Sequence, residues 1–183
     1  CEGQQMDVNF ETMENVTYDD YIEMITNKTG VLSAASFQIG ALIAGAKKED
    51  AELLYNFGKH IGIAFQIMDD YLDVFGNVEQ FGKKHAGDIY ENKKTVLYLL
   101  AMEHANEAEK KELDFWYSKK TEKVDKNYSV EKIFRRKKVD EKVLRLIQKH
   151  NEIGHDFLKQ IDAPEEKKKP FMELANYLLR RNS

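Results

Sequence analysis

Three aspartates, Asp69, Asp70 and Asp73, form the pattern D-D-x-x-D and are well suited to metal chemistry. On a helix, positions 69 and 73 lie on one face with position 70 beside them, so the carboxylates would share a small volume. Two such charges about 6 Å apart repel by about 3 kcal/mol at an effective dielectric constant near 20, and a divalent cation would offset this. Mg²⁺ takes one or two carboxylates, keeps several waters and bridges to phosphates. This aspartate cluster therefore predicts Mg²⁺ together with a phosphorylated ligand.

A second acidic set, Asp19, Asp20 and Glu23, has the same spacing and provides an internal comparison. It follows Thr17, a good N-cap residue, and would occupy the first turn of a helix, where the macrodipole favours anions. We interpret this set as structural. The aspartate cluster instead lies near the C-terminal end of its helix, where the dipole disfavours anions. Chance is the alternative, since 13 aspartates in 183 residues give about 0.06 random D-D-x-x-D matches.

The elements that must hold these residues are predicted to be helices. Prolines occur only at two late positions and runs of β-branched residues are few, so we expect an all-α fold in which residues 1–183 form one continuous domain. The aspartate cluster is expected on a long helix that begins at Asp50 and ends at Gly76, followed by a loop over 76–88. Gly45 is expected to close the preceding helix. The predicted helices span residues 18–27, 29–45, 50–76, 93–105, 108–119, 140–160 and 165–181.

Two glycines share the face of the long helix that carries the aspartate cluster. Gly62 and Gly58 lie one and two turns, respectively, before Gln66 on this stripe. Each glycine in a helix costs about 1 kcal/mol relative to alanine, so the space it leaves is expected to have a use. Two interpretations stay open: a groove for an elongated ligand that ends at the acidic residues, or close packing of a neighbouring helix.

Lysines that would balance a phosphate occur in three segments. Lys83 lies in F-G-K-K-H-A-G-D, and Lys93 lies in D-I-Y-E-N-K-K-T, five residues after Asp88. Lys28 lies in N-K-T-G, expected between two helices. Each lysine alone is more often a solvated surface residue, and the interpretation becomes specific only when the segments are taken together.

Composition excludes several classes of protein. The chain has 28 Lys and Arg against 32 Asp and Glu, a formal charge of −4, which argues against a nucleic-acid binder. It has no run of 18 apolar residues, so neither a transmembrane segment nor a secretory leader is expected. The one cysteine, Cys1, excludes a disulfide framework and favours a reducing compartment such as the cytoplasm. Because the chain starts at Cys1 without methionine, we expect it to be part of a longer protein.

Four motifs in register resemble the trans-isoprenyl diphosphate synthases. The run GKHIGIAFQIMDDYLDVFG, followed by FGKKHAGDIYENKKT, is similar to the second aspartate-rich region of this family. G-Q-Q-M-D at 3–7 and K-T-G at 28–30 occur in the same order, so the resemblance covers essentially the whole chain. It implies a helical bundle around a deep central cavity, of which this chain would be the C-terminal half, and usually a homodimer. The implied reaction is the head-to-tail condensation of isopentenyl diphosphate with an allylic diphosphate.

The resemblance also implies roles in binding metal and diphosphate. Asp69, Asp70 and Asp73 would bind Mg²⁺ on the allylic diphosphate, and Asp88 would support metal-bound water. Diphosphate oxygens would be held by three lysines: Lys28, Lys83 and Lys93.

Further residues are implied to surround the reacting carbon. Thr29 and Gln66 would place oxygen dipoles near the developing allylic cation, with Lys28 counted among the catalytic residues. The cavity itself would be lined by Gln4, Asp7, Gly62 and Phe65. The released pyrophosphate would be the base for the final proton loss, so no side-chain base is implied.

The sequence departs from the family pattern in two ways. Ala86 stands where the G-K loop usually has its second glycine, which requires a negative φ at that position or a slightly rearranged loop. The family's first aspartate-rich motif and its basic isopentenyl diphosphate pocket belong to the preceding half, and neither is in this chain.

Two alternatives to an active synthase therefore stay open. One is a non-catalytic partner subunit of a heteromeric synthase, and the other is a class I terpene cyclase, which shares the fold. The D-D-x-x-D that follows F-Q and the downstream G-K loop argue against a cyclase, whose second site is usually richer in Asn, Ser and Glu. Consumption of isopentenyl diphosphate distinguishes them, because cyclases do not use it.

Overall fold

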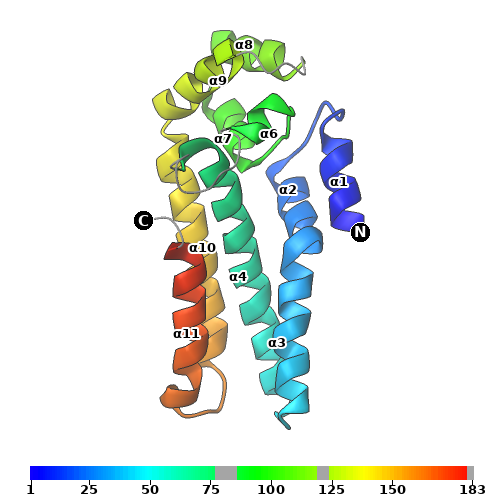
Figure 1. The fold of residues 1–183 in the computed structure, drawn as a ribbon, viewed down its shortest axis with the longest axis vertical. Helices are drawn as coiled ribbons and strands as arrows, with labels where there is room; N and C mark the ends of the chain where they lie inside the picture. Colours follow the sequence, from blue (N-terminus) through cyan, green and yellow to red (C-terminus); the bar gives the residue numbers. More distant parts are fainter. Residues whose placement is uncertain (77–85, 119–123, 181–183) are drawn as a thin grey trace.

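The computed structural model describes residues 1–76, 86–118 and 124–180, and all regular elements within these ranges are helices. The predicted all-α fold class is confirmed (Figure 1). The elements are α1 (Glu2–Phe10), α2 (Tyr18–Ile25), the π-helix η1 (Thr26–Gly30), α3 (Val31–Ile43), α4 (Lys48–Phe75), α6 (Gly87–Tyr90), α7 (Val96–His104), α8 (Glu107–Tyr117), α9 (Val124–Arg136), α10 (Val139–Lys159) and α11 (Glu165–Arg180).

The long helix α4 is the centre of the molecule. Its 28 residues span about 42 Å, and α3 and α10 pack along its two sides, with α11 beside α10 (Figure 1). Its apolar stripe includes Phe57, Ile61 and Ala64, all essentially buried. The short helices α6 and α7 gather with α8 and α9 around the C-terminal end of α4 (Figure 1). The aspartate cluster, near the C-terminal end of α4, therefore lies at the end of the bundle where these short helices gather.

The two glycines of α4 allow a close helix contact. A Cβ atom at Gly58 would lie 2.5 Å from Cδ2 of Phe37, and one at Gly62 would lie 3.0 Å from the Cα atom of Gly30. Helices this close leave no space for a ligand between them. The interpretation of this stripe as a ligand groove is therefore wrong, and the packing alternative is confirmed.

Several helix boundaries follow their local signals. Thr17 caps α2 in a capping box with Asp20. Gly45, with φ of +79°, follows the end of α3, and Gly76 is the C-cap of α4. The expected break between the segments 18–27 and 29–45 is wrong, because η1 joins α2 to α3. The sequence prediction also missed α1, α9 and the short helix α6.

Among the residues that the structure describes, no helix is both long and apolar enough to cross a membrane.

Candidate functional site

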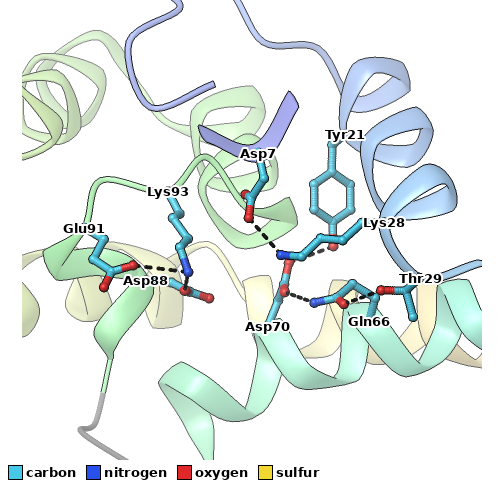
Figure 2. A network of polar contacts seen from close by, with 9 residues as sticks. All are labelled: Asp7, Tyr21, Lys28, Thr29, Gln66, Asp70, Asp88, Glu91 and Lys93. Atoms are coloured by element: carbon cyan, nitrogen blue, oxygen red, sulfur yellow. Dashed lines mark hydrogen bonds and ion pairs between the residues drawn. The ribbon is translucent and has the colours of Figure 1, made fainter. Parts of the chain in front are cut away.

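A polar pocket lies where α1, η1 and the segment after α6 meet the C-terminal half of α4 (Figure 2). Its volume is about 70 Å³, room for an ion and a few waters. The pocket is lined by Asp7, Phe10, Met24, Ile25, Lys28, Gln66, Asp69, Asp70, Asp88, Lys93, Lys94 and Thr95. Seven of the sequence-predicted residues thus share one pocket, and they come from segments up to 86 positions apart, from Asp7 to Lys93.

One wall of the pocket is an ion pair between α1 and η1. Lys28 Nζ lies 2.8 Å from Asp7 Oδ2, and both side chains are largely buried. Gly3 allows this contact, because a Cβ atom there would lie 2.2 Å from the backbone nitrogen of Lys28. Lys28 itself is on the π-helical turn, a feature that often marks functional sites. The motif G-Q-Q-M-D therefore places a glycine at the helix contact and a carboxylate one turn later beside the lysine.

A chain of hydrogen bonds runs across α4 (Figure 2). The Thr29 hydroxyl donates to Gln66 Oε1 at 2.8 Å, and Gln66 Nε2 donates to Asp70 Oδ1 at 3.1 Å. The Tyr21 hydroxyl donates to Asp70 Oδ2 at 2.8 Å. Both oxygens of Asp70 are thus engaged by neighbouring side chains. The chain fixes the orientation of the Gln66 amide, with its oxygen toward Thr29.

The carboxylates of the aspartate cluster lie in an environment that disfavours their charge. Burial, and then the nearby charge of Asp88, raise the pKa of Asp70 to about 7. The same two causes, in the same order, raise the pKa of Asp73 to about 6. Hydrogen bonds from Tyr21 and Gln66 offset only part of this for Asp70. A cation bound nearby would favour the ionised carboxylates.

The segment around α6 forms the opposite wall. Lys93 Nζ lies 2.7 Å from Asp88 Oδ1 and 3.2 Å from a Glu91 carboxylate oxygen. Burial opposes the charge of Lys93, but these two carboxylates prevail and raise its pKa. The backbone N–H of Asp88 donates to Asp73 Oδ2 at 3.0 Å, which joins α6 to α4.

Ala86, at the start of this wall, has φ of +57°. Of the two expected alternatives, a negative φ is therefore wrong, and the residue adopts the left-handed conformation that glycine favours. The other alternative, a rearranged loop, concerns residues 77–85, which lie outside the described part of the chain. The left-handed conformation costs an alanine about 1 kcal/mol. Ala86 is buried, and its N–H donates to the backbone oxygen of Asp73 at 2.7 Å, contacts that compensate for the strain.

The three members of the aspartate cluster do not converge as expected. Asp69 and Asp70 line the pocket, whereas Asp73 binds the backbone of Asp88. In the described part of the chain, no three His, Cys, Asp or Glu side chains are placed to hold a metal ion together. The reason is that Asp70 and Asp73 are occupied by contacts within the protein, which helical spacing does not reveal.

The remaining predicted residues lie outside the pocket or outside the described residues. Gln4 is exposed on α1, and Phe65 is half-buried on α4. Gly62 packs against η1 and α3 and is not among the residues that line this pocket, so its place in a cavity wall stays a prediction. Lys83 lies outside the residues that the structure describes.

Sequence reasoning also missed several residues of the site. Phe10, Met24 and Ile25 supply its apolar part, and Lys94 and Thr95 extend the wall after Lys93. The doubled lysine in N-K-K-T was the available signal for Lys94. Nothing in the sequence indicated the apolar residues, because they resemble any helix core.

The donor set fits magnesium held jointly with phosphate. Asp69 and Asp88 place two carboxylates at one pocket, which Lys28 and Lys93 also line. Mg²⁺ is commonly bound by one or two carboxylates and completed by waters and substrate phosphates, so a third protein ligand is not required. The lysines would face the anionic part of such a ligand.

Helices of the described residues gather acids and lysines around a polar pocket, an arrangement chemically suited to a metal-complexed phosphate. A model of the polyprenyl synthetase family matches residues 1–134. The chain belongs to this family, which confirms the resemblance seen in its motifs.

Individual relatives agree with this assignment. The geranylgeranyl diphosphate synthase of Methanosarcina mazei is 47% identical over 103 residues, 56% of this chain and 32% of that protein. A crystal structure of geranylgeranyl pyrophosphate synthase superimposes with a TM-score of 0.90 at 36% identity, covering 100% of this chain and 57% of that one. A crystal structure of a geranylgeranyl pyrophosphate synthase from Corynebacterium glutamicum, complexed with isoprenyl diphosphate and magnesium, gives a TM-score of 0.89 at 29% identity. This match covers 99% of this chain and 52% of that one. The chain spans about half the length of these solved structures.

Proposed function

We propose that this chain forms the diphosphate-binding wall of a prenyltransferase that condenses isopentenyl diphosphate with an allylic diphosphate. The observation that carries the proposal is the shared pocket of Lys28, Lys93, Asp69 and Asp88, bordered by the Thr29–Gln66 hydrogen bond. The solved complex of the Corynebacterium glutamicum relative with isoprenyl diphosphate and magnesium supports this choice of ligand.

The chain's own residues would act mainly by electrostatics. Lys28 and Lys93 now pair with Asp7 and Asp88, and diphosphate oxygens would replace or join these carboxylates as their partners. Their ammonium groups would stabilise the charge that develops on the leaving pyrophosphate when the allylic C–O bond breaks.

Two further groups complete the proposed site. The oxygens of Thr29 and Gln66, held by their mutual hydrogen bond, would face the allylic cation. Asp69 and Asp88 would hold Mg²⁺, which supplies Lewis-acid stabilisation of phosphate charge when bound. The new C–C bond forms to isopentenyl diphosphate, and the released pyrophosphate takes the proton that is lost.

We further propose that the chain is the C-terminal part of a longer isoprenoid synthase domain that acts as a cytoplasmic homodimer. Its match to about half the length of the solved synthases supports the first point. The one cysteine, Cys1, supports a reducing compartment.

The experiment supplies the chain with Mg²⁺, farnesyl diphosphate and radiolabelled isopentenyl diphosphate. It is run with the chain alone and with the part of the Methanosarcina mazei synthase that the chain does not match. We expect Mg²⁺-dependent pyrophosphate binding by the chain alone, and label in an apolar product only when the second part is present. Lys28→Met should weaken pyrophosphate binding by about tenfold or more, whereas the exposed Lys47→Met should not.

Other outcomes would contradict the proposal in distinct ways. Farnesyl diphosphate consumed without incorporation of isopentenyl diphosphate would indicate a cyclase. A chain that raises the turnover of an already active partner, yet binds no pyrophosphate itself, would be a non-catalytic subunit. Absence of pyrophosphate binding together with absence of turnover in both mixtures would overturn the function outright.

A further inference from the structure

The turn that follows α6 determines where two pocket residues lie. Asp88 is on α6 and Lys93 comes just after the turn, and the Lys93 N–H donates to the Asp88 backbone oxygen at 2.9 Å. Asn92, between them, is buried and has φ of +63°. Its N–H donates to the backbone oxygen of Ile89 at 3.2 Å. A change in this turn would therefore move the carboxylate and the ammonium of the pocket wall relative to each other.

A buried lysine of α9, which does not line the pocket, contacts this turn. Lys126 is 0% exposed, and its ammonium donates to Asn92 Oδ1 and, at 3.4 Å, to the backbone oxygen of Tyr90. The same nitrogen lies 5.6 Å from the ring centroid of Tyr117. Two carbonyl acceptors and an aromatic face are suitable partners for a desolvated ammonium. One side chain thus joins α9 to both ends of the Tyr90–Asn92 segment.

Packing alone does not account for a charged residue at this position. Burial lowers the pKa of Lys126 to about 8, so at neutral pH the amine remains mostly charged at a cost in desolvation. An apolar side chain of similar length would avoid that cost, but it would leave the buried Asn92 amide oxygen without this donor. Lys132, on the same helix, is exposed, and its ammonium lies 6.0 Å from the centroid of the Tyr128 ring.

We propose that Lys126 is a positioning residue whose ammonium fixes the Tyr90–Asn92 turn and thereby holds Asp88 and Lys93 in register at the pocket. Its action on the turn is a property of the fold. Its effect on ligand binding rests on the proposed function.

The test compares Lys126→Met with wild type at pH 7 by two readouts. Hydrogen–deuterium exchange should become faster in the segment 87–95 while α4 and α10 remain protected. Affinity for inorganic pyrophosphate in the presence of Mg²⁺, measured by calorimetry, should fall by about 10- to 100-fold, the usual effect of losing an outer-shell partner. Lys132→Met is the matched control, and it should leave both readouts at wild-type values.

A second variant approaches the same contact from the turn. Asn92→Gly keeps the left-handed backbone accessible and removes only the side-chain acceptor. It should reproduce the faster exchange and weaker affinity, and combining it with Lys126→Met should add less than the sum of the two effects, because both changes break one contact. Asn92→Gly also carries the test should Lys126→Met fail to fold.

The outcomes separate this proposal from the proposed function. Unchanged exchange in the turn, in whichever of the two variants folds, would overturn the positioning role. So would an increase spread evenly over α4 and α10, since that reports a general loss of stability. Wild-type protein that binds no pyrophosphate and shows no turnover in either mixture would remove the proposed function, and the exchange data would still decide whether Lys126 holds the turn.

Discussion

Two acidic sets with the same spacing have different surroundings in this molecule. Asp19 and Asp20 lie in the first turn of α2, whereas Glu23 lies beyond it, contrary to the expectation. The Asp20 carboxylate accepts from the backbone N–H of Thr17 at 2.8 Å and from its hydroxyl at 2.6 Å. These bonds lower the pKa of Asp20. Here the charge is stabilised by local backbone and side-chain donors in the first turn of a helix.

The aspartate cluster lies at the other end of its own helix and is partly buried. There the pKa values of Asp70 and Asp73 are raised, mainly by burial and then by the charge of Asp88. The comparison teaches that acidic spacing defines a helix face and nothing more. The position of the carboxylates along the helix and their burial from solvent decide whether they cap the helix or are suited to bind a cation.

The largest expected difference is in ligand binding. Asp69→Ala should weaken binding of Mg²⁺-pyrophosphate by at least about 100-fold, because it removes a pocket carboxylate. Asp19→Ala, in the first turn of α2, should change it by less than about twofold. Calorimetry measures both affinities, and circular dichroism should show unchanged helix content. Equal losses in the two variants would mean that the acidic sets are not functionally distinct.

The second difference is in the pH dependence of stability. The folded-state pKa of Asp70 is about 7 against an ordinary value of 3.8, so the folded protein binds the proton more tightly than the unfolded chain. This contribution is fully present below pH 3.8 and is lost as pH rises through 7. Between pH 5 and 8 the loss amounts to about 3 kcal/mol. For Asp20, whose pKa is lowered, the sign is opposite: its contribution is present above 3.8 and is lost on acidification.

Urea unfolding at several pH values checks these signs. The free energy of unfolding of Asp70→Asn minus that of wild type should rise from pH 5 to 8. The same difference for Asp20→Asn should fall as pH rises from 2 to 5. A flat difference for Asp70→Asn would show that its carboxyl titrates normally and that burial is not what distinguishes the aspartate cluster.

The features that could be predicted from the sequence are those with local causes. Thr17 and Asp20 are three residues apart, and Gly76 directly follows the last turn of α4. The N-cap of α2 and the C-terminal end of α4 could therefore be predicted from the sequence. The predicted pocket residues came from the family resemblance, because the order of the motifs identifies them without any knowledge of their positions in space.

The features that could not be predicted depend on distant contacts. Tyr21 reaches Asp70 across 49 positions, and Lys126 reaches Asn92 across 34. Neither contact has a signature in either segment. The same holds for the contact of Gly62 with Gly30, where a glycine stripe is equally compatible with a groove and with a packed helix. Tertiary packing, not spacing, determined these outcomes.

The smallest expected effect tests whether the two acidic sets are independent. Thr17→Ala removes the cap of α2 and should cost about 1 kcal/mol in the free energy of unfolding, measured with urea. Affinity for Mg²⁺-pyrophosphate should stay within about twofold, because the capping box lies outside the pocket. However, α2 also carries Tyr21, whose N–H donates to the Thr17 backbone oxygen and whose hydroxyl holds Asp70. A clear loss of affinity in Thr17→Ala would therefore show that fraying of this first turn reaches the aspartate cluster through Tyr21, and the structural set would then be part of the functional one.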